Sequence, residues 1–538
     1  MKALSKIRQL DNYLAVLCLL ALVFFGIYSY LSYATFNGGN IIFNSPDETA
    51  NYWAANTFYN NGNFTEFSDT SLYAGDITAP RSLRIIDNYL VPTGFLGMPW
   101  FYGMIAKLFG SSSIIPFLTP FFAALAVIFF YLSLRFLFSE KASFLSASLL
   151  LLHPAFWYYA TRSMMPNVLF LSLLIIGIYF FLKAIYKERN IWYIVSGILV
   201  GLSLMVRAAE IVWVLPLFVL LCLYYFKKIN WTSVWLTPVF TIAGMLPMFY
   251  YNNILFGQVF SLGYQLAPGV NISNFNWLPY LLPFGFNIAV IKLHVLQYFR
   301  DIFNWHYILT IIGFVLIFIS LYKSNKKYRL RLLAFLILLA VISGILVIYY
   351  GSWQFSDNPN PKAVTIGTSF VRYWLPIYIL LLPLIAIPIS RLFRKSTLAW
   401  SLICISILIV VAGFSYKDVY QDKQEGILAI KNTINNYQLM SDTVVQNTED
   451  NAVIIAKKSD KVFFPKRTVI YDLFYDVDYE RVAELVEHNP VYLWDWQHDE
   501  AAVSYINTTY YNKFNLEAIP LDVMYNNMRL YSIQNVNR

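Results

Sequence analysis

Long apolar segments recur along most of this chain, and short polar stretches separate them. A helix needs about 20 mainly apolar residues to cross the roughly 30 Å of hydrocarbon in a bilayer, and by this measure we expect about eleven spanning helices. They lie near residues 12–34, 116–134, 142–158, 163–182, 190–206, 210–226, 232–250, 306–322, 332–350, 372–390 and 398–415. Residues 94–110 are also apolar, but this segment is short and contains Pro99. We therefore expect it to form a helix lying at the outer membrane surface.

The composition agrees with this pattern. Hydrophobic residues make up 58% of the 538 residues and charged residues only 13%, which indicates a polytopic membrane protein rather than a soluble one. Lysine and arginine cluster near residues 183–189, 227–228, 323–331 and 391–395. Because basic loops stay in the cytoplasm, we expect the N-terminus on that side. The segments expected outside are 35–115, the loop near Arg207, 251–303, 351–371 and the chain after 416.

The last part of the chain differs in kind. From Tyr416 onward there are 12 basic and 18 acidic side chains, against 27 and 12 in residues 1–415. Helical patterns such as 478–488 alternate there with short apolar runs at 452–456, 468–473, 491–496 and 530–533. We therefore predict two domains. They are a mainly α membrane domain at 1–415, with its first outer loop at 35–115, and a small extracytoplasmic α/β domain at 416–538.

The first outer loop opens with the signals of a helix start. Ser45 and Pro46 suit the beginning of a helix, and Asp47 and Glu48 follow in its first turn, with Ser45 and Glu48 forming a capping box. We expect this helix to end near residues 60–62 and to rest on the membrane through one apolar face. That face consists of Ala50, Trp53, Ala54, Thr57 and Phe58. Acidic residues are favoured in any first turn, so the pair alone indicates a helix start more readily than a catalytic site.

This arrangement resembles the GT-C class of membrane glycosyltransferases, which includes the protein O-mannosyltransferases and the aminoarabinose transferase of lipid A. The resemblance begins with the acidic pair after the first apolar segment, the amphipathic helix and the second interfacial helix. Further matching segments follow in the same order within residues 1–390. They are Met164-Met165-Pro166-Asn167, the stretch from Gly201 to Arg207, the stretch from Tyr251 to Gly257 with Gly263-Tyr264, and Arg372-Tyr373-Trp374-Leu375-Pro376.

The resemblance implies a sugar donor on a polyprenyl phosphate and an acceptor that meets it at the outer membrane face. An attacking hydroxyl needs a base, and the resemblance assigns this role to Asp47, with Glu48 in support. A leaving phosphate needs positive charge in a dry site, for which Arg207 and Arg372 are the candidates. One carboxylate with two arginines implies a single displacement with inversion. Candidates for lining the substrate are Arg84, Arg162, Asn167, Tyr264 and Tyr373.

Each arginine also has a purely structural interpretation. Arg207 can be an ordinary loop charge between closely spaced helices, and Arg372 can be an interfacial residue whose head reaches water. Arg81 and Arg84, in the first outer loop, are weaker candidates, and a solvated loop charge is the favoured interpretation of each. Charged residues inside membrane segments are costly and are usually functional, which keeps Arg207 and Arg372 as the phosphate-binding candidates.

Nothing in the sequence predicts a cofactor. The five histidines show no metal-ligand spacing, and the cysteines Cys18, Cys222 and Cys404 all lie in apolar segments, so we expect no tightly bound metal. There is no P-loop and no Gly-rich dinucleotide signature, so direct use of nucleotide sugars is not expected. The expected partners are a polyprenyl-phosphate-linked sugar, an acceptor protein, lipid or glycan, and the bilayer, with no nucleic acid.

Other kinds of protein fit the same apolar pattern. A lipid or solute transporter or flippase would usually show inverted repeats and helices broken near the midplane, and we detect neither in the sequence. A non-catalytic scaffold would act through its external domain. Within the same class, an oligosaccharyltransferase would carry a WWDxG-type motif, and the nearest string, Leu493-Trp494-Asp495-Trp496, lacks the glycine.

Overall fold

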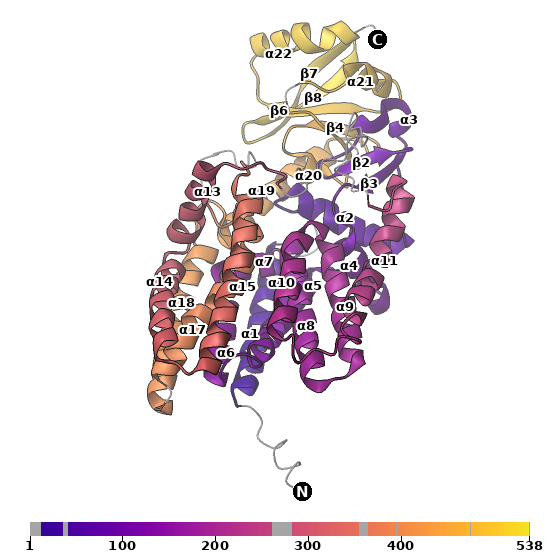
Figure 1. Cartoon of the computed structure of the whole chain (residues 1–538). Helices are drawn as coiled ribbons and strands as arrows, with labels where there is room; N and C mark the ends of the chain where they lie inside the picture. The colour runs from indigo at the N-terminus through magenta and orange to yellow at the C-terminus, as the bar shows by residue number, and fades with distance from the viewer. Residues whose placement is uncertain are drawn as a thin grey trace. The chain divides into compact units, whose positions relative to one another are not determined.

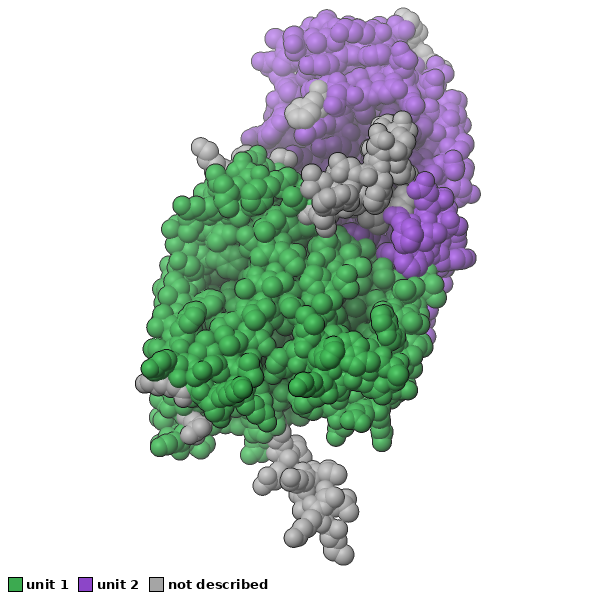
Figure 2. Space-filling view, in the orientation of Figure 1, with its two compact units in different colours: residues 1–32, 117–247, 271–429 green, residues 33–116, 248–270, 430–538 purple. Residues whose placement is uncertain are grey.

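The computed structural model describes residues 12–35, 41–260, 282–354, 364–393, 395–473 and 475–536. The chain divides into two compact units, and each unit is assembled from separate parts of the sequence (Figure 2). Unit 1 comprises Met1–Ser32, Phe117–Pro247 and Asn271–Ala429. Unit 2 comprises Tyr33–Pro116, Met248–Val270 and Ile430–Arg538.

Unit 1 is built from helices (Figure 1). The long helices among them are mostly apolar, because polar side chains that face hydrocarbon are costly. The helices that lie wholly or mainly in this unit are α1 Asn12–Thr35, α5 Ile115–Leu134, α6 Glu140–Leu152, α7 Pro154–Thr161, α8 Pro166–Lys187, α9 Asn190–Val206, α10 Ile211–Tyr224, α11 Leu236–Phe256, α13 Ile288–Val295, α14 Asn304–Lys323, α15 Lys326–Gly351, α16 Ser369–Tyr373, α17 Leu375–Leu392 and α18 Thr397–Tyr420.

Among the described residues, eight helices are long and apolar enough to cross a membrane, or nine if the bent pair of α9 and α10 counts as one span. The prediction of a multi-pass membrane protein is confirmed, but the expected number of spans is not. The single span expected at 142–158 is wrong, because α6 ends at Leu152 and Pro154 begins the new helix α7. Helices α9 and α10 meet at Arg207 with a bend of 119°.

Small residues bring two helices of unit 1 to backbone distance. Gly197 and Gly201 lie on one face of α9, opposite Thr241 and Gly244 of α11. A Cβ atom added at Gly201 would lie 2.2 Å from the carbonyl oxygen of Thr241 and 2.9 Å from the Cα atom of Gly244. Such close approach is typical of helix pairs inside membranes. It fixes the course of α9, and therefore the place where Arg207 emerges at its end.

Unit 2 combines the first loop of the chain with the C-terminal residues. In the first loop, β1 Glu66–Phe67, β2 Leu83–Ile86 and β3 Tyr89–Pro92 form an antiparallel sheet in the order β1-β3-β2. The helices that lie wholly or mainly in this unit are α2 Pro46–Asn61, α3 Ser71–Ala74, α4 Gly97–Phe109, α19 Ile427–Gln446, α20 Asp460–Phe463, α21 Tyr479–Val486 and α22 Glu500–Ile506.

The C-terminal residues form a five-stranded sheet in the order β5-β4-β6-β8-β7. Its strands are β4 Val453–Ala456, β5 Thr468–Tyr471, β6 Val491–Trp496, β7 Leu516–Tyr525 and β8 Met528–Asn535. Strand β4 runs parallel to both β5 and β6, whereas β8 is antiparallel to β6 and β7. The predicted α/β character is confirmed. Strand β7 was not predicted, because it is an edge strand in which only two residues are buried, and it has Pro520 in its middle.

The helix predicted after Ser45 is confirmed as α2, and Gly62 ends it in a left-handed conformation (φ 76°). The capping box is wrong in one part, because the Ser45 side chain accepts no capping hydrogen bond. The predicted apolar face is buried inside protein rather than laid on lipid. It packs against α4, where a Cβ atom at Gly103 would lie 2.8 Å from the carbonyl oxygen of Ala55.

The first loop and the C-terminal residues share one hydrophobic core. Trp53 and Phe58 of α2 pack in the same buried cluster as Ile454, Phe463 and Trp494. The compact units are not divided at residue 415, because they are defined by packing. The domain boundary expected there concerns membrane topology and stays a prediction. The expected surface helix at 94–110 corresponds to α4, which at 13 residues is too short to cross roughly 30 Å of hydrocarbon.

Candidate active site

Two guanidinium groups face one aromatic ring in unit 1. Arg207 follows the last residue of α9, and Arg372 lies in the short helix α16. Their Cζ atoms are 4.9 and 5.1 Å from the ring centroid of Tyr373. An aromatic ring attracts cations to its face, so the Tyr373 ring stabilises both guanidinium charges. The structure thus brings together three residues that the sequence singled out.

Glu210 binds Arg207 at the bend between α9 and α10. The Nε atom of Arg207 donates to Oε1 of Glu210 at 2.8 Å, and its Nη2 atom donates to the hydroxyl of Tyr350 at 3.3 Å. Glu210 also accepts from the hydroxyl of Tyr350 at 2.8 Å and from the indole N–H of Trp213 at 2.5 Å. The Arg207 and Glu210 side chains are only 9% and 3% exposed. A buried ion pair needs additional hydrogen bonds of this kind to persist.

Arg372 has neutral groups among its acceptors. Its Nη1 atom donates to the sulfur of Met165 at 2.8 Å, and its Nη2 atom donates to the hydroxyl of Ser369 at 3.0 Å. The side-chain amide of Asn167 donates to the backbone oxygen of Arg372 at 3.3 Å. Asn167, which we expected to line the substrate, therefore supports the backbone of the second arginine.

Arg162 lies next to this cluster, at the end of α7. Its Nη1 atom donates to the hydroxyl of Tyr158 at 3.0 Å, and its side chain is buried. The hydroxyl of the adjacent Tyr159 donates to the backbone oxygens of Ile366 and Thr368 at 3.2 and 3.3 Å. These bonds tie α7 to the segment that leads into α16 and Arg372.

Stacked rings extend the site beyond Tyr373. The ring of Tyr350 lies parallel to that of Tyr373, with centroids 4.6 Å apart and planes 8° apart. The ring of Trp353 also lies nearly parallel to that of Tyr373, with centroids 5.5 Å apart and planes 16° apart. Phe284 stacks in turn on Trp353, with ring centroids 4.1 Å apart. These rings form a wall of flat apolar faces beside the two arginines.

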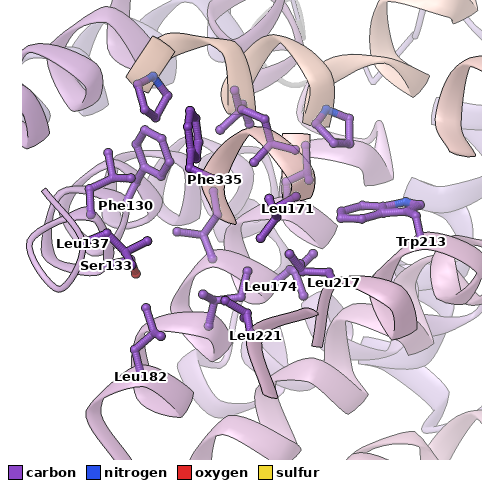
Figure 3. A pocket seen from close by; sticks show the side chains of 18 residues that line it. Phe130, Ser133, Leu137, Leu171, Leu174, Leu182, Trp213, Leu217, Leu221 and Phe335 are labelled. Atoms are coloured by element: carbon purple, nitrogen blue, oxygen red, sulfur yellow. The ribbon is translucent and has the colours of Figure 1, made fainter. Parts of the chain in front are cut away.

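An apolar cavity of about 130 Å³ lies among the helices of the same unit. Its walls come from α5, α8, α10, α15 and α17, and Figure 3 shows Leu171 and Trp213 among the side chains that surround it. Two links connect it to the arginine cluster: Trp213 lines the cavity and donates to Glu210, and Pro376 lines it three residues after Tyr373. Charged groups beside an apolar cavity suit a ligand with an anionic head and a hydrocarbon tail.

Asp47 lies in unit 2, as the second residue of α2. The hydroxyl of Ser82 donates to its Oδ1 atom at 2.7 Å. Asp47 is partly exposed, whereas the neighbouring Glu48 is only 2% exposed. Arg84 lies in β2, paired in register with Val91 of β3. Of the two acids, Asp47 is therefore the one that a substrate can reach.

Arg81 is not the solvated charge that we expected. Its Nη2 atom lies 2.6 Å from Oδ1 of Asp460, which is fully buried. Burial alone would lower the pKa of Arg81, but the hydrogen bond and the negative charge of Asp460 outweigh it and raise that pKa. The pair joins the first loop to the C-terminal residues within unit 2.

The predicted site residues fall into two groups. Arg162, Asn167, Arg207, Arg372 and Tyr373 lie together in unit 1, whereas Asp47, Glu48 and Arg84 lie in unit 2. The expected convergence of Asp47 with the arginines stays a prediction, as do the roles assigned to all of these residues. Tyr264 lies outside the described residues.

Metal binding was not expected, and the described ranges contain no group of three or more His, Cys, Asp or Glu residues that could hold a metal ion. The expectation itself stays a prediction.

Sequence reasoning missed Glu210, Tyr350 and Ser82. Glu210 carried a usable signal, because an acid three residues after an arginine at the end of an apolar segment is spaced for an ion pair. Ser82 carried none, since its partner Asp47 is 35 residues away and its local sequence is unremarkable for a loop.

Part of the chain matches a known protein family, and its structure is similar to solved structures. Residues 93–251 match the family described as dolichyl-phosphate-mannose-protein mannosyltransferase. No curated protein matches the sequence. The structure is similar to ArnT from Cupriavidus metallidurans bound to undecaprenyl phosphate, with a TM-score of 0.55 and 11% identity over 97% of this chain and 98% of that one.

It is also similar to the oligosaccharyltransferase AglB from Archaeoglobus fulgidus in complex with an inhibitory peptide and a dolichol-phosphate. There the TM-score is 0.51 and the identity 12%, over 89% of this chain and 69% of that one. The fold is that of the GT-C membrane glycosyltransferases, and with the family match it supports a multi-pass membrane glycosyltransferase. The resemblance inferred from the sequence is thereby confirmed.

Proposed function

We propose that this protein transfers a sugar from a polyprenyl-phosphate donor to an acceptor on the extracytoplasmic face of the membrane. The observation that carries the proposal is the joint position of Arg207 and Arg372 on Tyr373, beside an apolar cavity. This combination fits a lipid phosphate, whose head needs cations and whose tail needs an apolar surface. ArnT and AglB, which share the fold, have been captured with undecaprenyl phosphate and dolichol-phosphate.

In the proposed reaction, the acceptor hydroxyl attacks the anomeric carbon of the donor sugar. Asp47 takes the hydroxyl proton as the new carbon–oxygen bond forms. The bond from the anomeric carbon to the phosphate oxygen breaks, and its electron pair stays on the phosphate. Arg207 and Arg372 stabilise the charge that develops there. One displacement on one face of the sugar inverts the anomeric configuration.

Several contacts support these roles. Ser82 orients the Asp47 carboxylate by a hydrogen bond, and Glu210 fixes the direction of the Arg207 guanidinium. The stacked faces of Tyr350 and Trp353 lie beside Tyr373, where a sugar ring attached to the phosphate would meet an apolar wall. Glu48 is buried, so we assign it a supporting role in the first turn of α2.

The side of the membrane on which each loop lies follows from the distribution of basic residues. With the basic clusters inside, the N-terminus is cytoplasmic, and the loop that carries Asp47 and the residues after 416 are outside. Donor and acceptor then meet at the outer leaflet.

Transfer of a whole glycan, as in an oligosaccharyltransferase, is the variant suggested by the likeness to AglB. The string Leu493-Trp494-Asp495-Trp496 gives it little support, because Trp494 and Asp495 are both fully buried and Asp495 is paired with Lys457 at 2.7 Å. A transporter or flippase without transferase activity is the alternative outside the class.

The test uses membranes that contain the full-length protein and a panel of radiolabelled polyprenyl-phosphate sugars. We expect one label to leave the lipid, and Asp47→Asn to reduce transfer about 100- to 10,000-fold with normal expression. Asp69→Asn, at an exposed position in the same loop, is the matched control and should transfer normally. Label that crosses the membrane while still attached to its lipid, unaffected by Asp47→Asn, would instead indicate a flippase.

A further inference from the structure

The C-terminal sheet of unit 2 has no role in the reaction as described so far. In open α/β sheets, ligands bind beyond the carboxyl ends of parallel strands, where the chain order reverses. Here β4 has parallel neighbours on both sides, β5 and β6, so the segment after β4 occupies that position. This segment contains Lys458, Asp460 and Lys461, and all three contact the part of the first loop that surrounds Asp47.

The strongest of these contacts joins Asp460 to Arg81. The Asp460 carboxylate accepts from the backbone N–H of Arg81 at 2.9 Å, from its Nε atom at 3.1 Å and from its Nη2 atom at 2.6 Å. Nη2 also donates to the backbone oxygen of Lys458 at 2.9 Å, and the guanidinium lies 4.9 Å from the ring centroid of Tyr471. Asp460 is fully buried. Both the backbone and the side chain of Arg81 are therefore fixed by the C-terminal sheet.

Ser82 follows Arg81 directly and transmits this constraint to Asp47. Its backbone has a positive φ of 66°, a left-handed conformation that a residue with a side chain rarely adopts unless its surroundings impose it. In this conformation the Ser82 hydroxyl donates to Oδ1 of Asp47 at 2.7 Å. The chain from Asp460 through Arg81 and Ser82 to Asp47 is thus a continuous set of bonded groups.

A second contact reaches Asp47 from the other direction. The Nζ atom of Lys461 donates to the backbone oxygen of Asn44, three residues before Asp47. Lys461 also lies over the ring of Tyr437, at 5.1 Å from its centroid. It therefore holds the chain where it enters α2.

We propose that Asp460 and Lys461 of the C-terminal sheet are positioning residues for the carboxylate of Asp47. The carboxyl edge of the sheet, which in other α/β domains holds a soluble ligand, here holds the loop of the active site. The inference rests on the proposed function, since it gives Asp47 the role of base. It also gives the C-terminal residues a function, which neither the apolar pattern nor the fold comparison assigns to them.

The test uses the full-length protein with three variants: Asp460→Asn, Ser82→Ala and the double variant. Asp460→Asn keeps the size of the side chain but removes its charge. A misplaced carboxylate should lower kcat about tenfold to a hundredfold and change the donor KM little, because donor binding uses the arginines of unit 1. If Asp460 acts through Ser82, the double variant should be no slower than the slower single variant.

A second readout does not depend on activity. Hydrogen exchange of the backbone amides at residues 49–52, the first that bond within the turn of α2, reports how firmly the start of this helix is held. We expect faster exchange there in Asp460→Asn and in Arg81→Lys, which keeps the charge but loses the bidentate fork. Asp442→Asn is the matched control in unit 2, because its partner Lys466 lies at 3.4 Å and both side chains are at least a third exposed.

The outcomes separate the two proposals. Unchanged exchange at residues 49–52, or losses in kcat that multiply in the double variant, would overturn the positioning role while Asp47→Asn still abolishes transfer. If exchange rises as expected but Asp47→Asn retains full transfer, Asp47 is not the base. The proposed reaction mechanism then fails, and the positioning role fails with it.

Discussion

Each compact unit contains an ion pair in which a buried acid binds an arginine, and the two pairs differ in how far apart their partners lie in the sequence. Arg207 and Glu210 are three residues apart, at a bend between two helices of unit 1. Arg81 and Asp460 are 379 residues apart and connect the first loop to the C-terminal sheet of unit 2. The acid is at most 3% exposed in both pairs. The difference indicates different roles. The local pair orients one cation, whereas the distant pair holds together two segments that are far apart in the sequence.

The largest effect is expected from breaking the local pair. Glu210→Ala would leave the Arg207 guanidinium buried without its counter-charge, which typically costs about 3–5 kcal/mol. We expect a marked fall in the melting temperature of the purified protein in detergent. Glu210→Gln should have a smaller effect, because its amide oxygen can still accept a hydrogen bond from Trp213 or Tyr350. An unchanged melting temperature in Glu210→Ala would mean that the pair contributes no stability.

The distant pair should give a smaller coupling, because Arg81 keeps a quarter of its side chain in solvent. A double-mutant cycle with Arg81→Ala and Asp460→Ala should give an interaction free energy of about 1.5–3 kcal/mol, the range for hydrogen bonds to charged groups. The measurement is the opening free energy of the α2 amides by hydrogen exchange. An interaction free energy of zero would show that the Arg81–Asp460 pair does not hold the loop.

The same contrast explains what the sequence could predict. Elements that depend on local pattern were predictable: α2 from its Ser-Pro start and its 3.6-residue apolar period, and strands β4 and β6 from short apolar runs. The break at Pro154 was readable too, because a proline suits the first turn of a helix better than its middle. Strand β7 was hidden by its exposed edge and Pro520.

Contacts between distant segments could not be predicted from one sequence. Nothing at Arg81 indicates a partner 379 residues away, so a solvated loop charge was the natural expectation. The burial of the α2 face against the C-terminal core has the same origin, since its apolar period fits a membrane surface and a protein core equally well. Glu210 differs from these, because its spacing from Arg207 is local and could have been recognised.

The shared ring of Tyr373 gives an intermediate effect. Tyr373→Leu removes the ring that both guanidinium groups approach, and a cation–π contact in a dry site is worth about 1–2 kcal/mol. We expect the donor KM to rise by about five- to thirtyfold, measured by transfer from labelled polyprenyl-phosphate sugar. Tyr373→Phe keeps the ring and should stay near the wild-type value. Equal losses in both variants would mean that the hydroxyl, and not the ring face, is what the site uses.

The smallest effect is expected from a third ion pair, which separates burial from sequence distance. Arg135 and Glu140 of unit 1 lie 2.7 Å apart, as close as the other two pairs, but their side chains are 32% and 52% exposed. Water and salt screen such a pair, so Glu140→Gln should cost less than about 1 kcal/mol, including the interaction of the acid with the start of α6. The melting temperature should hardly change, and high salt should remove most of the change that is seen. If Glu140→Gln lowered the melting temperature as much as Glu210→Ala, exclusion from water would not be what makes the Arg207 pair strong, and the comparison between the two units would need another cause.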